Sequence, residues 1–150
     1  MPAHTPTSDE LKQFNQTLIT EFRMNGGNVS GWDSLLLLTT LGAKSNQPHT
    51  TPLGYSIDGD RLIIVAAAVG SPRHPAWYHN LVAHPNVIVE LHREQYRMHA
   101  VVAEGKERER LFSQHVKQSS ATLEYQEMVS RQFPVVILEP ITGELSWVAS

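Results

Sequence analysis

Cysteine is absent from this chain of 150 residues. Without it the protein has no disulfide, no thiolate nucleophile and no cysteine-ligated zinc or iron–sulfur centre. Any redox chemistry must therefore come from a bound cofactor. A chain without cysteine also suits a cytoplasmic protein, and the cytoplasm is the location that we expect.

Positive charge is scarce, with 12 Lys and Arg against 15 Asp and Glu and a net charge of −3. No cluster of basic residues is long enough to follow a phosphate backbone, so we expect no nucleic-acid partner. Long apolar runs are also missing, because residues 35–38 and 62–69 fall far short of the ~20 residues that a transmembrane helix needs. We therefore expect a soluble protein with one domain over residues 1–150.

Several motifs that identify enzyme classes are missing as well. The sequence has no G-x-G-x-x-G after a strand pattern, no P-loop and no G-x-S-x-G, which disfavours a Rossmann fold, a P-loop fold and a hydrolase triad. His74, His79 and His84 recur at a spacing of five, which places successive side chains well apart around a helix, and no carboxylate lies between them. We interpret them as surface or capping histidines and expect no metal site.

What is present is a series of short strand and helix patterns. Residues 1–7 are typical of a loose tail, and apolar residues recur at helical spacing over 8–25. Strand patterns cover 35–41, 50–57, 61–68, 87–92, 96–103, 134–139 and 143–149. Helical patterns cover 75–83 and, broken near Ser119 and Ser120, 104–131. Six or so strands, joined mostly by hairpins, predict a mainly β fold with helices (α+β), built on a small antiparallel barrel.

The segment from Gly42 to His49 connects two predicted strands with a glycine, one lysine and four further hydrogen-bonding side chains. Backbone N–H groups and a lysine in such a loop suit a phosphate or a carboxylate. The alternative is an ordinary solvated turn, which often has the same composition. The loop is therefore a candidate anion site that needs support from its surroundings.

The short helix predicted to begin at Pro75 carries aromatic and amide side chains. Trp77 and Asn80 share a face at i and i+3, so one can pack while the other forms hydrogen bonds. Ser71 and Arg73 precede this helix, whose N-terminus favours an anion. The alternative for Trp77 is a core anchor. Tyr125, further along the chain, is a candidate proton donor or substrate contact, with a packing role as its alternative.

These motifs together resemble the deazaflavin-dependent nitroreductase family, whose members use coenzyme F420 on a split β-barrel. The resemblance covers nearly the whole chain, through FRMNGG at 22–27, LLTTLGAKSNQPHTTPL at 37–53, HPAWYHNLVAHPNVIVEL at 74–91 and FPVVILEP at 133–140. It implies a six-stranded antiparallel split β-barrel of the flavin-reductase or FMN-binding type. It also implies hydride transfer from reduced deazaflavin to a small-molecule acceptor, which is a quinone, a nitroaromatic or an activated enone.

The resemblance also implies which residues form the cofactor site. Lys44, Ser45 and Gln47 match the family loop that binds the acidic tail of F420, and His49 takes a place usually given to a cation. The cofactor-binding residues implied in this way are Lys44, Ser45, Gln47, His49, Thr50, Thr51, Pro52, Leu53, Val65, Ala66, Ala67, Ala68, Arg73, Ala76, Trp77, Tyr78 and Asn80. Tyr125 matches a tyrosine that lies near the substrate in the nitroreductase and is the implied catalytic residue.

The sequence departs from the family pattern at several of these places. Ala43 stands where the family loop has arginine, and Asn46 stands where it has glycine. Ala67 and Ala68 stand where the nitroreductase has serine and lysine. Two cations for the anionic tail are therefore missing, and we expect Arg73 to compensate for part of their loss.

Two other functions remain open on the sequence. The first is a non-catalytic split-barrel protein that carries a cofactor or a lipid, and the second is an FMN-dependent oxidoreductase on the same barrel. Split barrels of this class often form homodimers, which is an expectation for this chain. The helix over 8–25 has few cations on its polar face, so peripheral contact with a membrane is the weaker interpretation of it.

Overall fold

Seven strands form one antiparallel sheet in the computed structural model, which describes residues 7–141. Their bounds are β1 Leu35–Leu41, β2 Pro48–Gly54, β3 Ser56–Asp58, β4 Arg61–Val65, β5 Asn86–Leu91, β6 Glu94–Val102 and β7 Val135–Pro140. The order across the sheet is β2-β1-β5-β6-β7-β4-β3. The helices are α1 Ser8–Met24, α2 Ala76–Ala83, α3 Gly105–Gln118 and α4 Ser120–Met128, with a short 3₁₀ turn η1 at Ala68–Gly70. The protein is thus an α+β fold, as predicted.

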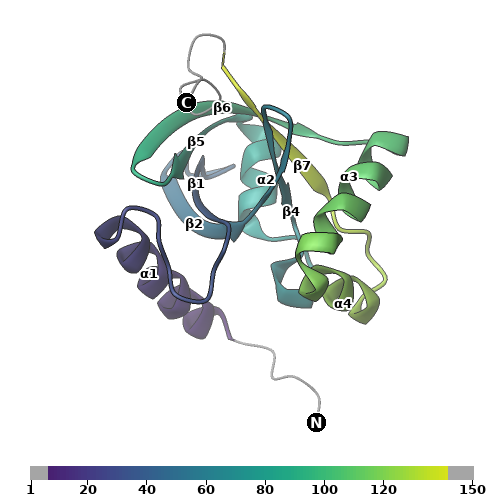
Figure 1. Ribbon diagram of the computed structural model, residues 1–150, viewed down its shortest axis with the longest axis horizontal. Coiled ribbons are helices and arrows are strands. Elements are labelled where there is room, and N and C mark those ends of the chain that lie inside the picture. Colours follow the sequence, from purple (N-terminus) through teal and green to yellow (C-terminus); the bar gives the residue numbers. More distant parts are fainter. Residues whose placement is uncertain (1–6, 142–150) are drawn as a thin grey trace.

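The sheet is curled, because its two edge strands follow each other in the chain. β2 ends at Gly54 and β3 begins at Ser56, yet they lie at opposite edges. In a flat sheet of seven strands these edges would be about 29 Å apart. Two residues of extended chain span at most about 7 Å. The sheet must therefore curl until its edges approach each other, as Figure 1 shows.

The expected number of strands, six, was wrong, because the chain changes its pairing partner between Gly54 and Ser56. The pattern at 50–57 predicted a single strand, but the chain leaves β1 after Gly54 and pairs with β4 from Ser56 onward. The Tyr55 N–H donates to the Ser34 carbonyl at the turning point, at 3.3 Å. The described residues therefore contain seven strands and not six. The predicted strand at 143–149 lies outside the described residues.

Two further boundaries differ from the sequence prediction. The strand expected over 61–68 ends at Val65, where pairing with β7 stops, and residues 68–70 form η1 instead. Pro75 precedes α2 as its N-cap and is not its first residue. The predicted helix at 8–25 and the break near Ser119 are confirmed, the latter by a non-helical backbone at Ser119.

Alternation along the central strands separates three apolar clusters. The even-numbered residues of β1, β4 and β7 point into the curled sheet, where Leu36, Leu62 and Val136 meet α2 through Trp77 and Leu81. The odd-numbered residues point outward and are covered by helices. α1 covers β1 with Leu18, Ile19 and Phe22, and α3 covers β4 and β7 with Leu111 and Phe112. Because the inner cluster covers one face of β1 and α1 covers the other, β1 is apolar at each of its first four positions.

Helix α1 is capped at its start and tied to the sheet near its end. Thr7 and Glu10 form a capping box at its start, and Arg23 near its end makes a two-point ion pair with Glu90 of β5, at 2.8 and 3.1 Å. Its apolar face is used against β1, which favours the packing interpretation of this helix. Within residues 7–141, none of the helices has both the length and the apolar character that crossing a membrane requires.

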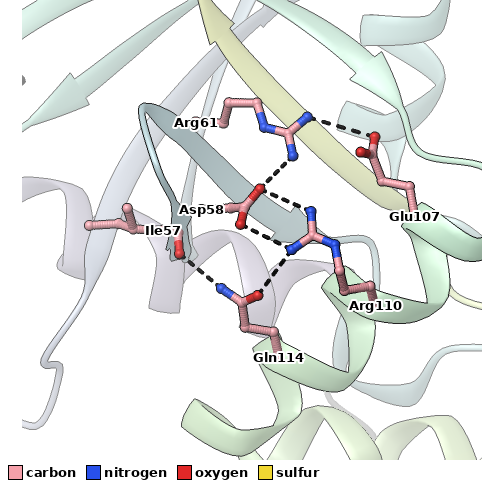
Figure 2. A network of polar contacts seen from close by, with 6 residues as sticks. All are labelled: Ile57, Asp58, Arg61, Glu107, Arg110 and Gln114. Carbon is pink, nitrogen blue, oxygen red and sulfur yellow. Dashed lines mark hydrogen bonds and ion pairs between the residues drawn. The ribbon is translucent and has the colours of Figure 1, made fainter.

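Charged side chains fix α3 to the hairpin of β3 and β4, as Figure 2 shows. Asp58 lies between two guanidinium groups: it pairs with Arg61, and it accepts bonds of 3.1 and 3.2 Å from Arg110. Arg61 also approaches Glu107 at 3.7 Å, and the Gln114 side chain donates to the Ile57 carbonyl at 3.1 Å. The hydrogen bonds from Arg110 and then Arg61 lower the pKa of Asp58 from 3.8 to about 2.

Asp58→Asn is expected to lower the free energy of unfolding at pH 7 by about 1 kcal/mol, after allowance for solvent screening. Because the folded pKa is the lower one, the contribution of Asp58 is complete above pH 4 and is lost as the pH falls toward 2. Urea unfolding of both proteins at pH 7 and at pH 2.5 measures this, and the difference between them should shrink at the lower pH. Asp60→Asn, in the adjacent turn, is the control. An equal loss for both variants would contradict the assignment to the network.

Candidate functional site

The predicted anion loop is the hairpin between β1 and β2. The Gly42 N–H donates to the Gln47 carbonyl at 2.8 Å, and the Asn46 N–H donates to the Gly42 carbonyl at 3.0 Å. Asn46 has a φ of +57°, a region in which asparagine is among the few residues tolerated besides glycine. The residue that replaces the family's glycine can therefore keep the shape of the turn.

Most side chains of this loop are available to a ligand. Lys44, Ser45, Gln47 and His49 are exposed, and Lys44 forms no ion pair with any residue in the described range. The Ser45 hydroxyl folds back over Gly42, where a β-carbon would overlap it, and accepts from the Gln47 N–H at 3.2 Å. The loop thus presents one free cation and several polar groups on a hydrogen-bonded turn.

Asn80 connects this loop to α2. Its side chain is buried, with its Oδ1 accepting from the Ala43 N–H at 3.0 Å and its Nδ2 donating to the Thr40 hydroxyl at 3.1 Å. The two bonds join residues 37 and 40 positions earlier in the chain. The structure therefore places Asn80 as the support of the loop, and its i, i+3 partner Trp77 is buried on the same face, as predicted.

The predicted cofactor-binding residues outside the loop are here called the wall residues, and four of them belong to the inner core cluster. Leu53, Ala66, Trp77 and Tyr78 belong to one apolar cluster, in which Leu53 and Tyr78 are half-buried and Trp77 is 6% exposed. On β2, Pro52 is buried and Thr51 is half-buried, while the Thr50 hydroxyl bonds to Thr39 at 2.7 Å. The tryptophan thus serves chiefly as a core anchor, with only an edge left for a ligand.

The segment from Val65 to His74 lies beside these residues and has an unusual backbone. Val65, Ala67 and Ala68 are half-buried, and Ala68 has a φ of +49° although it carries a β-carbon. Gly70 follows at +79° and is packed so closely that a β-carbon there would lie 3.2 Å from Cδ1 of Tyr125. The predicted catalytic tyrosine is therefore next to the predicted wall, and α4 is packed on η1.

Arg131 is a residue of this site that the sequence analysis missed. Its guanidinium donates to the carbonyl groups of Ala66, Ala67 and Ser71 and to Nδ1 of His74, all at 2.9 to 3.0 Å. A lone arginine in a non-periodic stretch before a strand gives no signal of such contacts. His74, interpreted as a surface or capping histidine, is half-buried, and burial, followed by the Arg131 charge, lowers its pKa.

Arg73 and, at the start of α2, Ala76 are exposed, so Arg73 is available to an anion.

Open depressions among the described residues include one of about 720 Å³ and one of about 650 Å³. The first is lined by the start of α3 and by Gln132. The second is lined by the end of α1, by Trp32 and by Arg93. Neither is lined by a predicted site residue. No group of three or more His, Asp or Glu side chains within residues 7–141 is arranged to hold a metal ion.

The family model and the sequence relatives agree on one family. The family model of the F420H(2)-dependent quinone reductases matches residues 13–140. A quinone reductase of this name from Mycobacterium tuberculosis is 41% identical over 117 residues, which are 75% of this chain and 78% of that protein. The solved F420-H2 dependent reductase FDR-A is 33% identical with a TM-score of 0.66, over 75% of this chain and all of that one. Another structure, described as a domain-swapped dimer, is 31% identical with a TM-score of 0.68, over 88% and 98% of the two chains. This chain belongs to the F420H(2)-dependent quinone reductase family.

Proposed function

We propose that this protein is an F420H2-dependent oxidoreductase that reduces a quinone, and that nitroaromatics or activated enones are its further acceptors. Family membership supports the activity. The observation in the structure that carries the proposal is the pair of hydrogen bonds made by Asn80. They fix a loop with a free lysine against the helix that bears Trp77 and Tyr78. A site for an anionic tail and a site for a flat ring thereby become neighbours.

The residues present fit the cofactor at both ends. Lys44, Ser45, Gln47 and His49 are exposed on one turn and suit the carboxylates of the tail, through charge and hydrogen bonds. Leu53 and Tyr78 are half-buried against the inner core cluster and suit the apolar faces of a ring, whereas Val65 packs on the opposite face of the sheet, in the cluster under α3. We assign the remaining implied residues, from Thr50 to Pro52, from Ala66 to Ala68 and at Arg73 and Ala76, to the same site.

Bound reduced F420 supplies a hydride from a ring carbon to an electron-poor acceptor. The protein needs no nucleophile and no metal for this step, because its task is to orient the ring and to exclude water. Asn80 and Arg131 would hold the two segments on which the cofactor rests. Tyr125 is half-buried next to Gly70 and would donate a proton to the reduced acceptor.

The finer description of the fold is part of this proposal. We assign the curled sheet to the split β-barrel type, which is supported by the similarity to FDR-A. A homodimer is supported by the related structure that is described as domain-swapped. A single domain and a cytoplasmic location stay predictions of the sequence.

A fluorescence titration of the purified protein with F420, and with FMN in parallel, tests the cofactor. We expect saturable quenching by F420 without competition from FMN. Oxidation of F420H2 by menadione then tests the activity. Binding without turnover would identify a carrier, and binding of FMN in place of F420 would identify a flavin enzyme.

Charge in the loop should control the affinity for F420. Lys44→Ala is expected to weaken binding about tenfold, because it removes the one cation of the turn, and the loss should shrink at high salt. Ala43→Arg restores the arginine of the family pattern and should tighten binding by a similar factor. The same titration at low and high ionic strength measures both, with Lys117→Ala in α3 as the control. Unchanged affinity in all three variants would show that the tail binds elsewhere.

A further inference from the structure

Arg131 uses most of its donors on a single segment of the chain. An arginine side chain has five N–H groups in a fixed plane. In this structure Nε donates to the Ser71 carbonyl at 2.9 Å, Nη2 to the Ala67 carbonyl at 2.9 Å, and Nη1 to the Ala66 carbonyl at 3.0 Å and to Nδ1 of His74 at 2.9 Å. The guanidinium also lies over the Phe133 ring, 4.5 Å from its centroid, which fixes its plane.

The segment that it holds has few other contacts of its backbone polar groups with the rest of the protein: the Ala66 N–H donates to the Pro134 carbonyl at 2.9 Å, and α4 packs on η1. After Val65 the chain leaves the sheet, and residues 66–74 contain Ala68 and Gly70 at positive φ. The backbone bonds inside it are short-range turns, from Ala67, Gly70 and Ser71 to carbonyls two or three residues earlier. A backbone of this kind keeps one shape only when its surroundings impose it. Arg131 is 57 to 65 residues away in sequence and imposes that shape from outside.

We propose that Arg131 is a positioning residue for the cofactor site: it holds residues 66–74 in the conformation that presents the Ala66–Ala68 wall and His74 to the ring. This inference rests on the proposed function. The predicted site includes residues of this segment, and Arg131 adds a residue outside the segment that binds the carbonyl groups of Ala66, Ala67 and Ser71 together.

The contacts also define the state of His74. A guanidinium only donates, so Nδ1 of His74 must accept and carries no proton. The imidazole is therefore neutral, with its proton on Nε2. Its ring lies 5.0 Å from the ring of Tyr78, which links Arg131 through His74 to a predicted wall residue on α2. Loss of Arg131 would free both the tautomer and the position of His74.

Arg108 provides a matched control in the same protein. Arg108 is buried where Arg131 is half-buried, and like Arg131 it lies 4.5 Å from a phenylalanine ring centroid, that of Phe112. It lies at the start of α3, and its side chain donates to the Phe133 carbonyl at 2.6 Å and pairs with Glu109. Loss of either arginine removes a cation–π contact and at least one bond to a backbone carbonyl, but of the two only Arg131 bonds to the segment 66–74.

The experiment compares Arg131→Met, Arg131→Lys and Arg108→Met by F420 titration, by F420H2 kinetics with menadione, and by hydrogen exchange over residues 66–74 without cofactor. We expect Arg131→Met to raise the Kd and KM for the cofactor about tenfold or more and to speed exchange in this segment. Arg131→Lys should recover part of the affinity, since an ammonium reaches fewer acceptors. Arg108→Met should lose stability while its Kd stays within about twofold of the wild type.

The possible results separate a failure of the positioning role from a failure of the proposed function. Equal Kd values for the Met variants of both arginines, or faster exchange at 66–74 with unchanged Kd, would overturn the positioning role. Absence of F420 binding by the wild-type protein would instead overturn the proposed function, and with it this inference. The exchange measurement separates these two failures, because it reports on the segment without any cofactor.

Discussion

Asn80→Ala is expected to weaken F420 binding about tenfold or more and to lower the free energy of unfolding by about 1–3 kcal/mol. The Asn80 amide is buried, and each of its two bonds satisfies a different element: the Ala43 N–H in the loop and the Thr40 hydroxyl on β1. Its removal leaves the Ala43 N–H without its partner and releases the turn that carries Lys44. Fluorescence titration and urea unfolding of the same preparation measure the two effects.

Two further variants make this prediction specific. Asn80→Asp keeps an acceptor for Ala43 but places a buried anion beside the loop for an acidic tail, so its affinity for F420 should fall further than that of Asn80→Ala. Asn86→Ala removes an exposed bond of 3.1 Å to His99, which joins β5 to β6 and not to the loop, and should leave binding unchanged. Full affinity in Asn80→Ala would mean that the loop keeps its shape by its own hydrogen bonds.

Trp77→Ala should lower the free energy of unfolding by about 3–5 kcal/mol, the largest loss of stability that we expect from one substitution in this site. The indole is 6% exposed and packs with Leu36, Ala66 and Leu81 inside the curled sheet. Its loss leaves a cavity between α2 and the sheet that the small neighbours cannot fill. Chemical denaturation measures the change, and Trp77→Phe should recover more than half of it.

The control for Trp77 is another tryptophan of the described range. Trp32→Ala, at 40% exposure in the segment after α1, should cost about 1 kcal/mol or less. A loss of F420 affinity in Trp77→Phe at nearly full stability would support a ring contact at the exposed edge. If Trp77→Ala unfolds at the same urea concentration as the wild type, the core role is wrong.

The structure explains how the loop keeps its shape despite its departures from the family pattern. Asn46 occupies a left-handed turn position and can replace glycine without loss of shape. Ala43 cannot replace arginine in charge, but its backbone N–H is the group that Asn80 binds. The loop therefore keeps its geometry while it loses positive charge, which is why we expect substitutions in it to change affinity and not folding.

The sequence by itself determined the elements that repeat over short distances. Helical spacing identified α1, an apolar run identified β1, and alternating apolar and polar residues identified β5 and β6. The break between α3 and α4 was also visible at Ser119. Motif order over most of the chain indicated the family. These features depend on residues that are close to one another in the sequence, so a single sequence contains them.

Only the tertiary structure decided how residues far apart in sequence meet. The pattern at 50–57 is a continuous strand signal, and nothing local shows that Gly54 and Ser56 pair at opposite edges of the sheet. The sequence identified Asn80 as a hydrogen-bonding site residue but did not identify its partner, and it contained no signal for Arg131. Their contacts with Ala43 and Ala66 span 37 and 65 positions. The curl of the sheet and the packing of α4 on η1 select these partners, and no periodicity encodes a contact between backbone groups and a distant side chain.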